Sequence, residues 1–199
     1  MAYLIIKKQI VSSFLKILAV GLVVGFGIKI FVLESFTVPT DSMEPTILRG
    51  SKIWLNKLPF TPRRGDIVAF QKDGESFVKR IVGLPSDSVV AEGGKFRLSK
   101  SENLNGGAFF KIPKRGETLT LNALNIDFYK TIIERGDGGA VTKLFDKIFI
   151  NGSESTTYTF QQNYYFLQGD NTEGSIDSRD WGLIAENQII GKPIFTQKH

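Results

Sequence analysis

The stretch D-I-V-A-F-Q-K-D-G-E-S-F-V-K-R-I-V-G, residues 66–83, contains two short runs rich in β-branched and aromatic residues. The runs at 66–70 and 77–82 both have the composition of strands. Little helical periodicity follows Phe36, and further short apolar runs, separated by glycine- or proline-marked turns, lie at 52–55, 88–91, 96–98, 147–150 and 163–167. This pattern predicts a mainly β domain.

A change in composition marks the middle of the chain. Residues 99–145 contain N-G-G, K-I-P-K-R-G-E and G-D-G-G, with one helix predicted at 125–134. We expect 99–145 to form an inserted, less regular subdomain or lid. Residues 35–98 and 146–199 would then form the β core.

An apolar segment, residues 10–33, precedes this domain. Its uninterrupted apolar part, 17–28, is flanked by Lys16 and Lys29. The whole segment is long enough to cross a hydrocarbon layer of about 30 Å, provided that both lysines extend to the head groups. Basic residues gather on its N-terminal side, so the positive-inside rule places the N-terminus in the cytoplasm. We therefore expect residues 1–34 to be a cytoplasmic N-terminus and a single transmembrane anchor.

Two alternatives to an anchor remain. A cleaved signal peptide would also have a basic start and a short apolar centre. Small residues at Gly25 and Gly27 fit a cleavage site, although apolar sequence resumes after Lys29. The other alternative is a buried core helix, but a segment that is apolar on all faces favours the membrane.

Composition excludes several classes of chemistry. The sequence contains no cysteine and a single histidine, His199. Disulfides, thiolate metal ligands, a cysteine nucleophile and a Ser-His-Asp triad are therefore excluded. The net charge of +5 comes from scattered residues rather than from a basic block. This distribution argues against nucleic-acid binding and suits an anionic membrane surface. We expect no metal and no cofactor.

What remains for nucleophilic catalysis is a serine–lysine pair. Ser42 lies in V-P-T-D-S-M-E-P-T-I, residues 38–47, a polar turn bracketed by prolines. Lys79 lies within the apolar run 77–82, where burial would lower its pKa from about 10.4 towards 7–8 and let the neutral amine act as a base. The alternative interpretation of Lys79 is an exposed cation on a strand.

A third segment is the loop G-D-N-T-E-G-S-I-D-S-R-D-W-G, residues 169–182, which directly follows the apolar run 163–167. Its acids, its arginine and its hydroxyl groups could form a network that braces an active site. The alternative is a solvated surface loop.

Together these segments resemble bacterial type I signal peptidase (leader peptidase), a family of membrane-anchored serine–lysine endopeptidases. P-T-D-S-M-E-P-T (39–46) resembles the family's nucleophile box, and R-R-G-D-I-V-A-F (63–70) resembles the strand box after it. F-V-K-R-I-V-G-L-P-S-D (77–87) resembles the lysine box, and 169–182 resembles the C-terminal box. The resemblance implies an antiparallel β catalytic core with an inserted subdomain, preceded by one transmembrane helix.

The resemblance also implies catalytic roles. Ser42 would be the nucleophile and Lys79 the general base. The backbone N–H of Ser42 and the hydroxyl of Thr40 would form the oxyanion hole. Met43 belongs to the nucleophile box and is expected to touch the substrate. Asp41 stands where many relatives have a small residue, and we expect its side chain to point to solvent.

The C-terminal box would supply the supporting residues. Ser175 would hydrogen-bond Lys79 and direct its amine towards the nucleophile. Asp177 and Arg179 would pair to hold the loop, with Asp170 supporting them.

The implied function is removal of N-terminal signal peptides from exported preproteins. Cleavage would follow a small-x-small motif and pass through an acyl-enzyme. The partners would be signal peptides and the lipid bilayer. The protein would sit in the bacterial cytoplasmic membrane as a single-pass protein, with its catalytic domain on the outer, periplasmic side.

Other functions stay open at this point. A self-cleaving repressor-type protease shares a related core, but it would need a DNA-binding domain where this chain has an apolar segment. A catalytically silent, membrane-anchored β-domain could bind peptides or scaffold a complex. A relative dedicated to one substrate, such as a pilus or conjugation factor, would have the same motifs. The sequence leaves the oligomeric state open.

Overall fold

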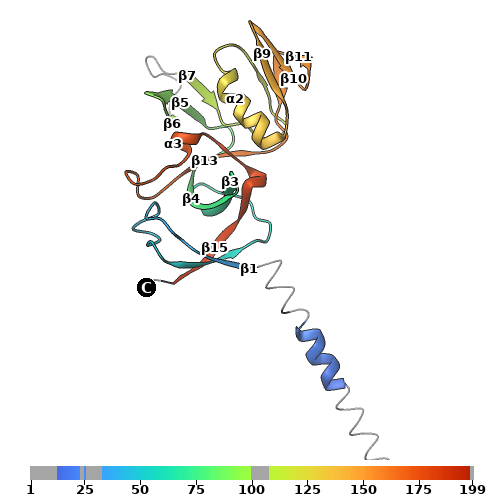
Figure 1. Ribbon diagram of the computed structural model, residues 1–199, viewed down its shortest axis with the longest axis vertical. Coiled ribbons are helices and arrows are strands. Elements are labelled where there is room, and N and C mark those ends of the chain that lie inside the picture. The colour runs from blue at the N-terminus through green and yellow to red at the C-terminus, as the bar shows by residue number, and fades with distance from the viewer. Residues whose placement is uncertain (1–12, 23–24, 26–32, 100–107, 198–199) are drawn as a thin grey trace, which may run out of the picture.

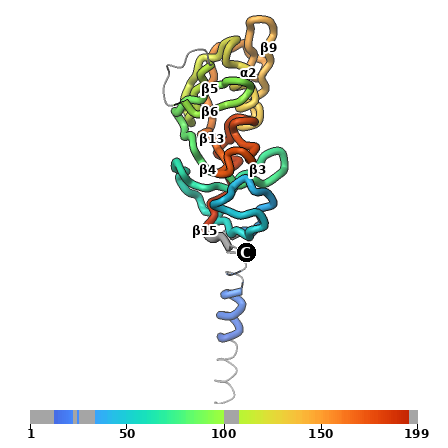
Figure 2. Tube along the Cα trace, turned by 90° about the vertical axis from the view of Figure 1, so that its left-hand side faces the viewer, coloured from blue at the N-terminus to red at the C-terminus, as the bar shows by residue number. Residues whose placement is uncertain are grey.

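The computed structural model describes residues 13–22, 25, 33–99 and 108–197. A seven-stranded antiparallel sheet forms one end of the β body, with β15 and β1 near its outer limit (Figures 1 and 2). Its strand order is β1 (Leu33–Thr37), β2 (Lys52–Asn56), β15 (Ile189–Gln197), β3 (Ile67–Lys72), β4 (Glu75–Gly83), β13 (Tyr164–Gln168) and β14 (Ile184–Ala185). The predicted mainly β fold is confirmed for the described residues.

Smaller antiparallel sheets gather at the opposite end of the β body (Figures 1 and 2). They are β6-β5-β7 (Lys95–Ser99, Ser88–Glu92, Ala108–Lys111), β12-β8 (Thr157–Thr159, Thr118–Thr120) and β11-β10-β9 (Ser153–Glu154, Lys147–Ile150, Val141–Leu144). One helical segment packs among them, α2 (Ile126–Ile132) continued by η1 (Ile133–Asp137), close to the predicted helix at 125–134. Two short helical turns, α3 (Ser178–Trp181) and η2 (Glu186–Gln188), flank β14.

Strand pairing gives the group of smaller sheets different limits from those of the predicted insertion at 99–145. The hairpin β5–β6 pairs with β7 and not with the large sheet. Strands β10, β11 and β12 also pair within the small sheets. The group therefore begins at Ser88 and extends to Thr159. A local composition change could not reveal this, because pairing depends on partners distant in sequence.

The central strand β4 follows from its alternating sequence. Val78 packs in one core cluster and Ile81 in another, so the two side chains point to opposite faces of the sheet. Lys79 lies opposite Val68 of β3 in the pairing register. Because neighbouring strands and clusters cover both faces, Val78, Lys79 and Ile81 are all buried. This position, and not sequence alone, explains how a lysine becomes part of the interior.

Much of the predicted membrane span, residues 10–33, lies outside the described residues. Residues 13–22 are helical, and their large apolar side chains are exposed: Phe14, Leu15, Ile17, Leu18, Val20 and Leu22. None of the helices in the described part of the chain has the length and apolar character needed to cross a membrane.

The core beneath the nucleophile turn is a testable feature of this fold. Leu55 of β2 is 1% exposed and packs with Met43, Ile47 and Ile53. Truncating a buried leucine costs about 2–5 kcal/mol, because the transfer free energy is lost and a cavity is left. We expect Leu55→Ala to lower the free energy of unfolding by that amount, measured by urea denaturation. Leu124→Ala is the matched control, because Leu124 is 86% exposed and its truncation should change stability by less than about 0.5 kcal/mol.

Candidate active site

Ser42 lies on the tight turn that follows β1. The backbone N–H of Glu44 donates to the carbonyl of Asp41, and that of Ile47 donates to the carbonyl of Met43, both at 2.9 Å. The side chains of Met43 and Ile47 are buried in the core cluster below. These two anchors fix the turn and hold Ser42, which is only 5% exposed, against the face of the sheet.

Lys79 reaches this turn from the middle of β4. Its Nζ donates a hydrogen bond to the Oγ of Ser42 at 2.6 Å, across 37 residues of sequence. Lys79 is 2% exposed. The exposed-cation interpretation is therefore wrong, and the structure brings the two predicted residues into direct contact.

Burial changes the acid–base behaviour of this lysine. Desolvation lowers the pKa of Lys79 from its ordinary value of 10.5 to about 8, while the nearby carboxylate of Asp177 opposes part of that change. A substantial fraction of the amine is therefore neutral slightly above neutral pH. A neutral amine hydrogen-bonded to a hydroxyl can accept its proton.

Asp177 organises the loop next to the lysine. Its carboxylate accepts hydrogen bonds from the backbone N–H of Gly169 at 2.9 Å, from the hydroxyl of Ser175 at 2.8 Å, and from Nε and Nη2 of Arg179, each at 2.8 Å. Burial by itself would raise the pKa of Asp177, but these hydrogen bonds outweigh it and lower the pKa. A fully buried, charged carboxylate is thus kept beside Lys79.

The same loop packs closely on the nucleophile turn. The backbone N–H of Asn171 donates to the carbonyl of Ser42 at 3.1 Å. A Cβ at position 169 would lie 2.4 Å from that carbonyl oxygen and 2.2 Å from the Oγ of Ser175. Only glycine fits this approach, and Gly169 therefore sets how near the loop comes to Ser42.

The groups expected to form the oxyanion hole lie beside the nucleophile. The Oγ1 of Thr40 is 3.1 Å from the Oγ of Ser42. None of the described residues accepts a hydrogen bond from the backbone N–H of Ser42. Thr40 is exposed, so a substrate could approach these donors from solvent. Asp41 is also exposed, which matches the expectation that its side chain points to solvent.

Three expected contacts differ in the structure. The hydroxyl of Ser175 donates to Asp177 and not to Lys79, because the carboxylate lies within its reach. Asp170 does not join the Asp177–Arg179 pair. It forms a bidentate pair with Arg80 at 2.8 and 2.6 Å.

Met43 is the third difference. Its side chain is 0% exposed and packs in the core, so it presents no surface to a substrate. An apolar residue next to the nucleophile could equally line a pocket or anchor the turn, and the residue type does not distinguish the two.

Sequence reasoning missed three residues at this site: Arg80, Gly169 and Asn171. Arg80 directly follows Lys79, so strand alternation alone predicts that their side chains point to opposite faces of β4. Gly169 and Asn171 lie in the quoted loop, but their contacts with Ser42 depend on tertiary packing. No group of three or more metal-ligating side chains was found among the described residues.

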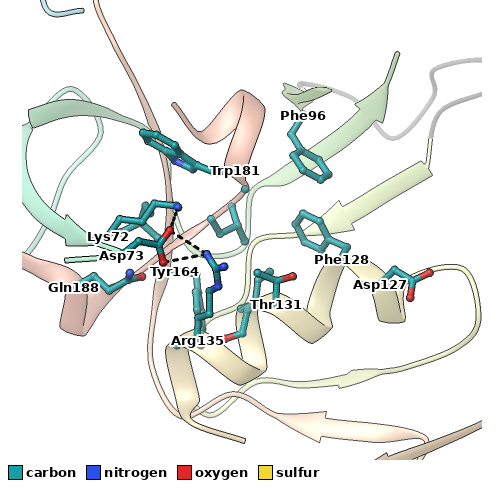
Figure 3. Close-up of a pocket in the computed structure, with 15 residues that line it drawn as sticks. Lys72, Asp73, Phe96, Asp127, Phe128, Thr131, Arg135, Tyr164, Trp181 and Gln188 are labelled. Atoms are coloured by element: carbon teal, nitrogen blue, oxygen red, sulfur yellow. Dashed lines mark hydrogen bonds and ion pairs between the residues drawn. The ribbon is translucent and has the colours of Figure 1, made fainter. Parts of the chain in front are cut away.

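A separate cavity of about 330 Å³ lies between the hairpin β3–β4, α2–η1 and α3 (Figure 3). Arg135 reaches from η1 towards Asp73, and the ammonium of Lys72 lies 5.2 Å from the ring centre of Trp181. The Nε1 of Trp181 is buried and has no hydrogen-bond partner within the part of the chain that the structure describes. Neither Ser42 nor Lys79 lines this cavity.

Comparison with known proteins identifies the family of this chain. The family model described as "Signal peptidase, peptidase S26" matches residues 11–197. The chain belongs to the signal peptidase family, peptidase S26. Members of the family remove signal peptides, and this chain is accordingly a serine peptidase of the signal peptidase I type.

Individual signal peptidases match most of the chain. It is 29% identical to the signal peptidase I of Buchnera aphidicola subsp. Baizongia pistaciae, over 97% of this chain and 78% of that protein. It is 28% identical to signal peptidase I of Aquifex aeolicus, covering 94% and 82%. It is 26% identical to signal peptidase IB of Staphylococcus aureus strain COL, covering 95% and 90%.

The buried lysine of this signal peptidase should be visible in its stability. Below pH 8 the folded and unfolded states both bind the proton, and the folded state bears the cost of a buried ammonium. Between pH 8 and 10.5 the folded state releases the proton first, so the stability of the wild type rises with pH. Lys79→Met removes the charge and keeps an unbranched side chain.

We expect Lys79→Met to raise the free energy of unfolding at pH 7 by up to roughly 3 kcal/mol, and this gain to shrink as the pH rises from 8 to 10.5. Urea denaturation over this pH range measures the difference. Lys114→Met is the control, because Lys114 is exposed and its replacement should give a nearly constant difference. A pH-independent gain for Lys79→Met would contradict a desolvated amine.

Proposed function

We propose that this chain removes signal peptides from exported preproteins with Ser42 as the nucleophile and Lys79 as the general base. The observation that supports the proposal most is the 2.6 Å hydrogen bond between a buried lysine amine and a serine hydroxyl. The sequence contains no cysteine, and its one histidine, His199, lies outside the described residues. Within the described part of the chain, Lys79 is the base in contact with the hydroxyl of Ser42.

The reaction proceeds in two halves. Neutral Lys79 takes the proton of Ser42 as Oγ bonds to the scissile carbonyl carbon, and the C=O π electrons move to its oxygen. When the tetrahedral intermediate collapses, the C–N bond breaks and the ammonium of Lys79 protonates the leaving amine. Water, deprotonated by the same lysine, then hydrolyses the ester of Ser42 and releases the signal peptide.

Two donors stabilise the negative oxygen. The backbone N–H of Ser42 and the hydroxyl of Thr40 lie beside the reacting oxygen of Ser42. A preorganised donor of this kind contributes about 3–4 kcal/mol to transition-state stabilisation. The hydroxyl of Thr40 can donate to the oxyanion because its present contact, the Oγ of Ser42, becomes bonded to the substrate during the attack.

The Asp177 network positions the base. The carboxylate of Asp177 fixes Ser175, Gly169 and Arg179 around it. Its charge raises the pKa of Lys79 and so limits the effect of burial. The amine thereby retains enough basicity to accept a proton and still titrates near neutral pH.

The substrate would bind as an extended segment beside the sheet, with small residues at the first and third positions before the cleaved bond. Residues 10–33 would anchor the enzyme in the cytoplasmic membrane, with the catalytic domain on the outer side. Exposed apolar side chains on helical residues 13–22 suit a lipid environment. Enzyme and substrate would then meet within one bilayer.

The catalytic assignment is tested with a purified preprotein bearing a small-x-small site, in detergent or vesicles. Ser42→Ala and Lys79→Met should each reduce kcat/KM by at least about 10³-fold, because each removes an essential part of the dyad. Far-UV circular dichroism and urea unfolding confirm that each variant is folded.

Ser153→Ala and Lys114→Ala are the matched controls, because both side chains are exposed. Both should cleave at the wild-type rate. Wild-type cleavage by either dyad variant would refute the assignment. Binding of the preprotein without cleavage by the wild type would favour a catalytically silent domain.

The pH dependence gives an independent test. Activity requires neutral Lys79, so kcat/KM should rise with pH through a midpoint of about 8. Asp177→Asn removes a charge that raises the pKa of the lysine, so its midpoint should move to lower pH, with reduced activity because the ion pair with Arg179 is lost. A wild-type midpoint near 10, or an upward move in Asp177→Asn, would contradict this acid–base assignment.

A further inference from the structure

Asn171 holds two successive carbonyl groups of the nucleophile turn. Its backbone N–H donates to the carbonyl of Ser42 at 3.1 Å. Its side-chain Nδ2 donates to the carbonyl of Asp41 at 3.4 Å, across 130 residues of sequence. The peptide unit between Asp41 and Ser42, and the one after it, are therefore both bound by a single residue of the C-terminal loop.

The orientation of the Asn171 side chain is itself fixed. Its Oδ1 accepts a hydrogen bond from the backbone N–H of Gly174 at 3.1 Å. This contact places the Oδ1 of Asn171 towards Gly174, so that the NH₂ group faces the nucleophile turn. A Cβ at position 174 would lie 2.6 Å from Nδ2. The close packing of Gly174 thus holds the amide in place.

Because a peptide unit is planar, the contact of Asn171 with the carbonyl of Asp41 also limits the direction of the N–H of Ser42. A trans peptide is planar, and its C=O and N–H point in opposite directions. The carbonyl of Asp41 and the N–H of Ser42 belong to one such unit. The carbonyl of Asp41 is held from two directions, by Nδ2 of Asn171 and by the backbone N–H of Glu44 at 2.9 Å within the turn. With the carbonyl held on the side of the loop, the N–H of Ser42 must face away from it. If the unit rotated, the oxygen of Asp41 would move towards the side where the N–H now points.

We propose that Asn171 is a positioning residue that keeps the backbone N–H of Ser42 directed at the developing oxyanion. The inference rests on the proposed function, since it assigns the N–H of Ser42 to the oxyanion hole. That N–H has no acceptor among the described residues, as expected of a donor kept available for substrate. Asn171 contributes to transition-state stabilisation without touching the substrate.

Two variants separate the donor of Asn171 from its other contacts. Asn171→Ala removes the whole amide. Asn171→Asp keeps the shape and the acceptor for the N–H of Gly174, but cannot donate to Asp41. Removing an oxyanion donor outright costs about 10²–10³ in kcat, and misdirecting one should cost less. We expect kcat to fall about 10–100-fold in both variants, with KM changed less than about threefold.

The decisive measurement compares two peptide inhibitors that differ only at the reacting carbon. Both have the sequence of the preprotein up to the cleavage site, and one ends in an aldehyde and the other in the corresponding alcohol. Ser42 Oγ adds to the aldehyde carbon, its proton passes to Lys79, and the former carbonyl oxygen becomes the oxyanion. The alcohol cannot form this adduct. In Asn171→Ala, aldehyde affinity should fall in parallel with kcat/KM, while alcohol affinity stays within about twofold.

A second measurement and a control variant test whether the loop as a whole is disturbed. The midpoint of the pH–rate profile of Asn171→Ala should stay at about 8, because this substitution adds no charge and leaves Asp177 and Lys79 unchanged. Glu173→Gln is the matched control, because this exposed side chain lies on the same loop and should leave both inhibitor affinities unaltered.

Wild-type kcat in both variants would overturn the proposal. Equal losses of aldehyde and alcohol affinity in Asn171→Ala, or a displaced pH midpoint of that variant, would do so as well, since they indicate a moved loop and not a misdirected N–H. Should Asn171→Ala fail to fold, Asn171→Asp supplies the comparison of the two inhibitors, but not that of the pH midpoint, because its added charge itself raises the pKa of Lys79. Full activity of Ser42→Ala would instead refute the proposed function on which the inference depends.

Discussion

The hydrogen bond from the amine of Lys79 to the hydroxyl of Ser42 depends on keeping a lysine inside the protein. The two atoms are 2.6 Å apart, and Lys79 is 2% exposed. Lowering its pKa to about 8 costs roughly 3 kcal/mol of folding free energy near neutral pH. The large sheet offsets this cost through clusters on both faces of β4, which contain Val78 and Ile81.

Around this pair, the structure separates two tasks. Core packing under the nucleophile turn, through Met43 and Ile47, fixes where the hydroxyl lies. Hydrogen bonds from the C-terminal loop fix the environment of the base and, in our proposal, the direction of the Ser42 N–H. Both tasks use rigid contacts, which suits a site that must be organised before the substrate arrives.

Gly169 shows how the two tasks are joined. It packs against both the carbonyl of Ser42 and the hydroxyl of Ser175, and its N–H donates to Asp177. Asn171 makes the next contact along the same loop. In our proposal, a shift of this loop would thus affect the nucleophile, the base and the oxyanion donor together. The family's C-terminal box would accordingly be part of the reaction geometry and not only a support for the fold.

The sequence alone narrowed the possible chemistry, because its lack of cysteine and its single histidine left few candidate nucleophiles and bases. It also determined the mainly β fold, since strand periodicity is local. The tertiary structure decided which groups meet. Ser175 bonds Asp177, Asp170 pairs with Arg80, and Met43 is core. Several polar partners of similar type were available to Ser175 and to Asp170, and Met43 could have lined a pocket or packed in the core. The choice among them depends on distances of a few ångströms between distant segments, which only the packed chain defines.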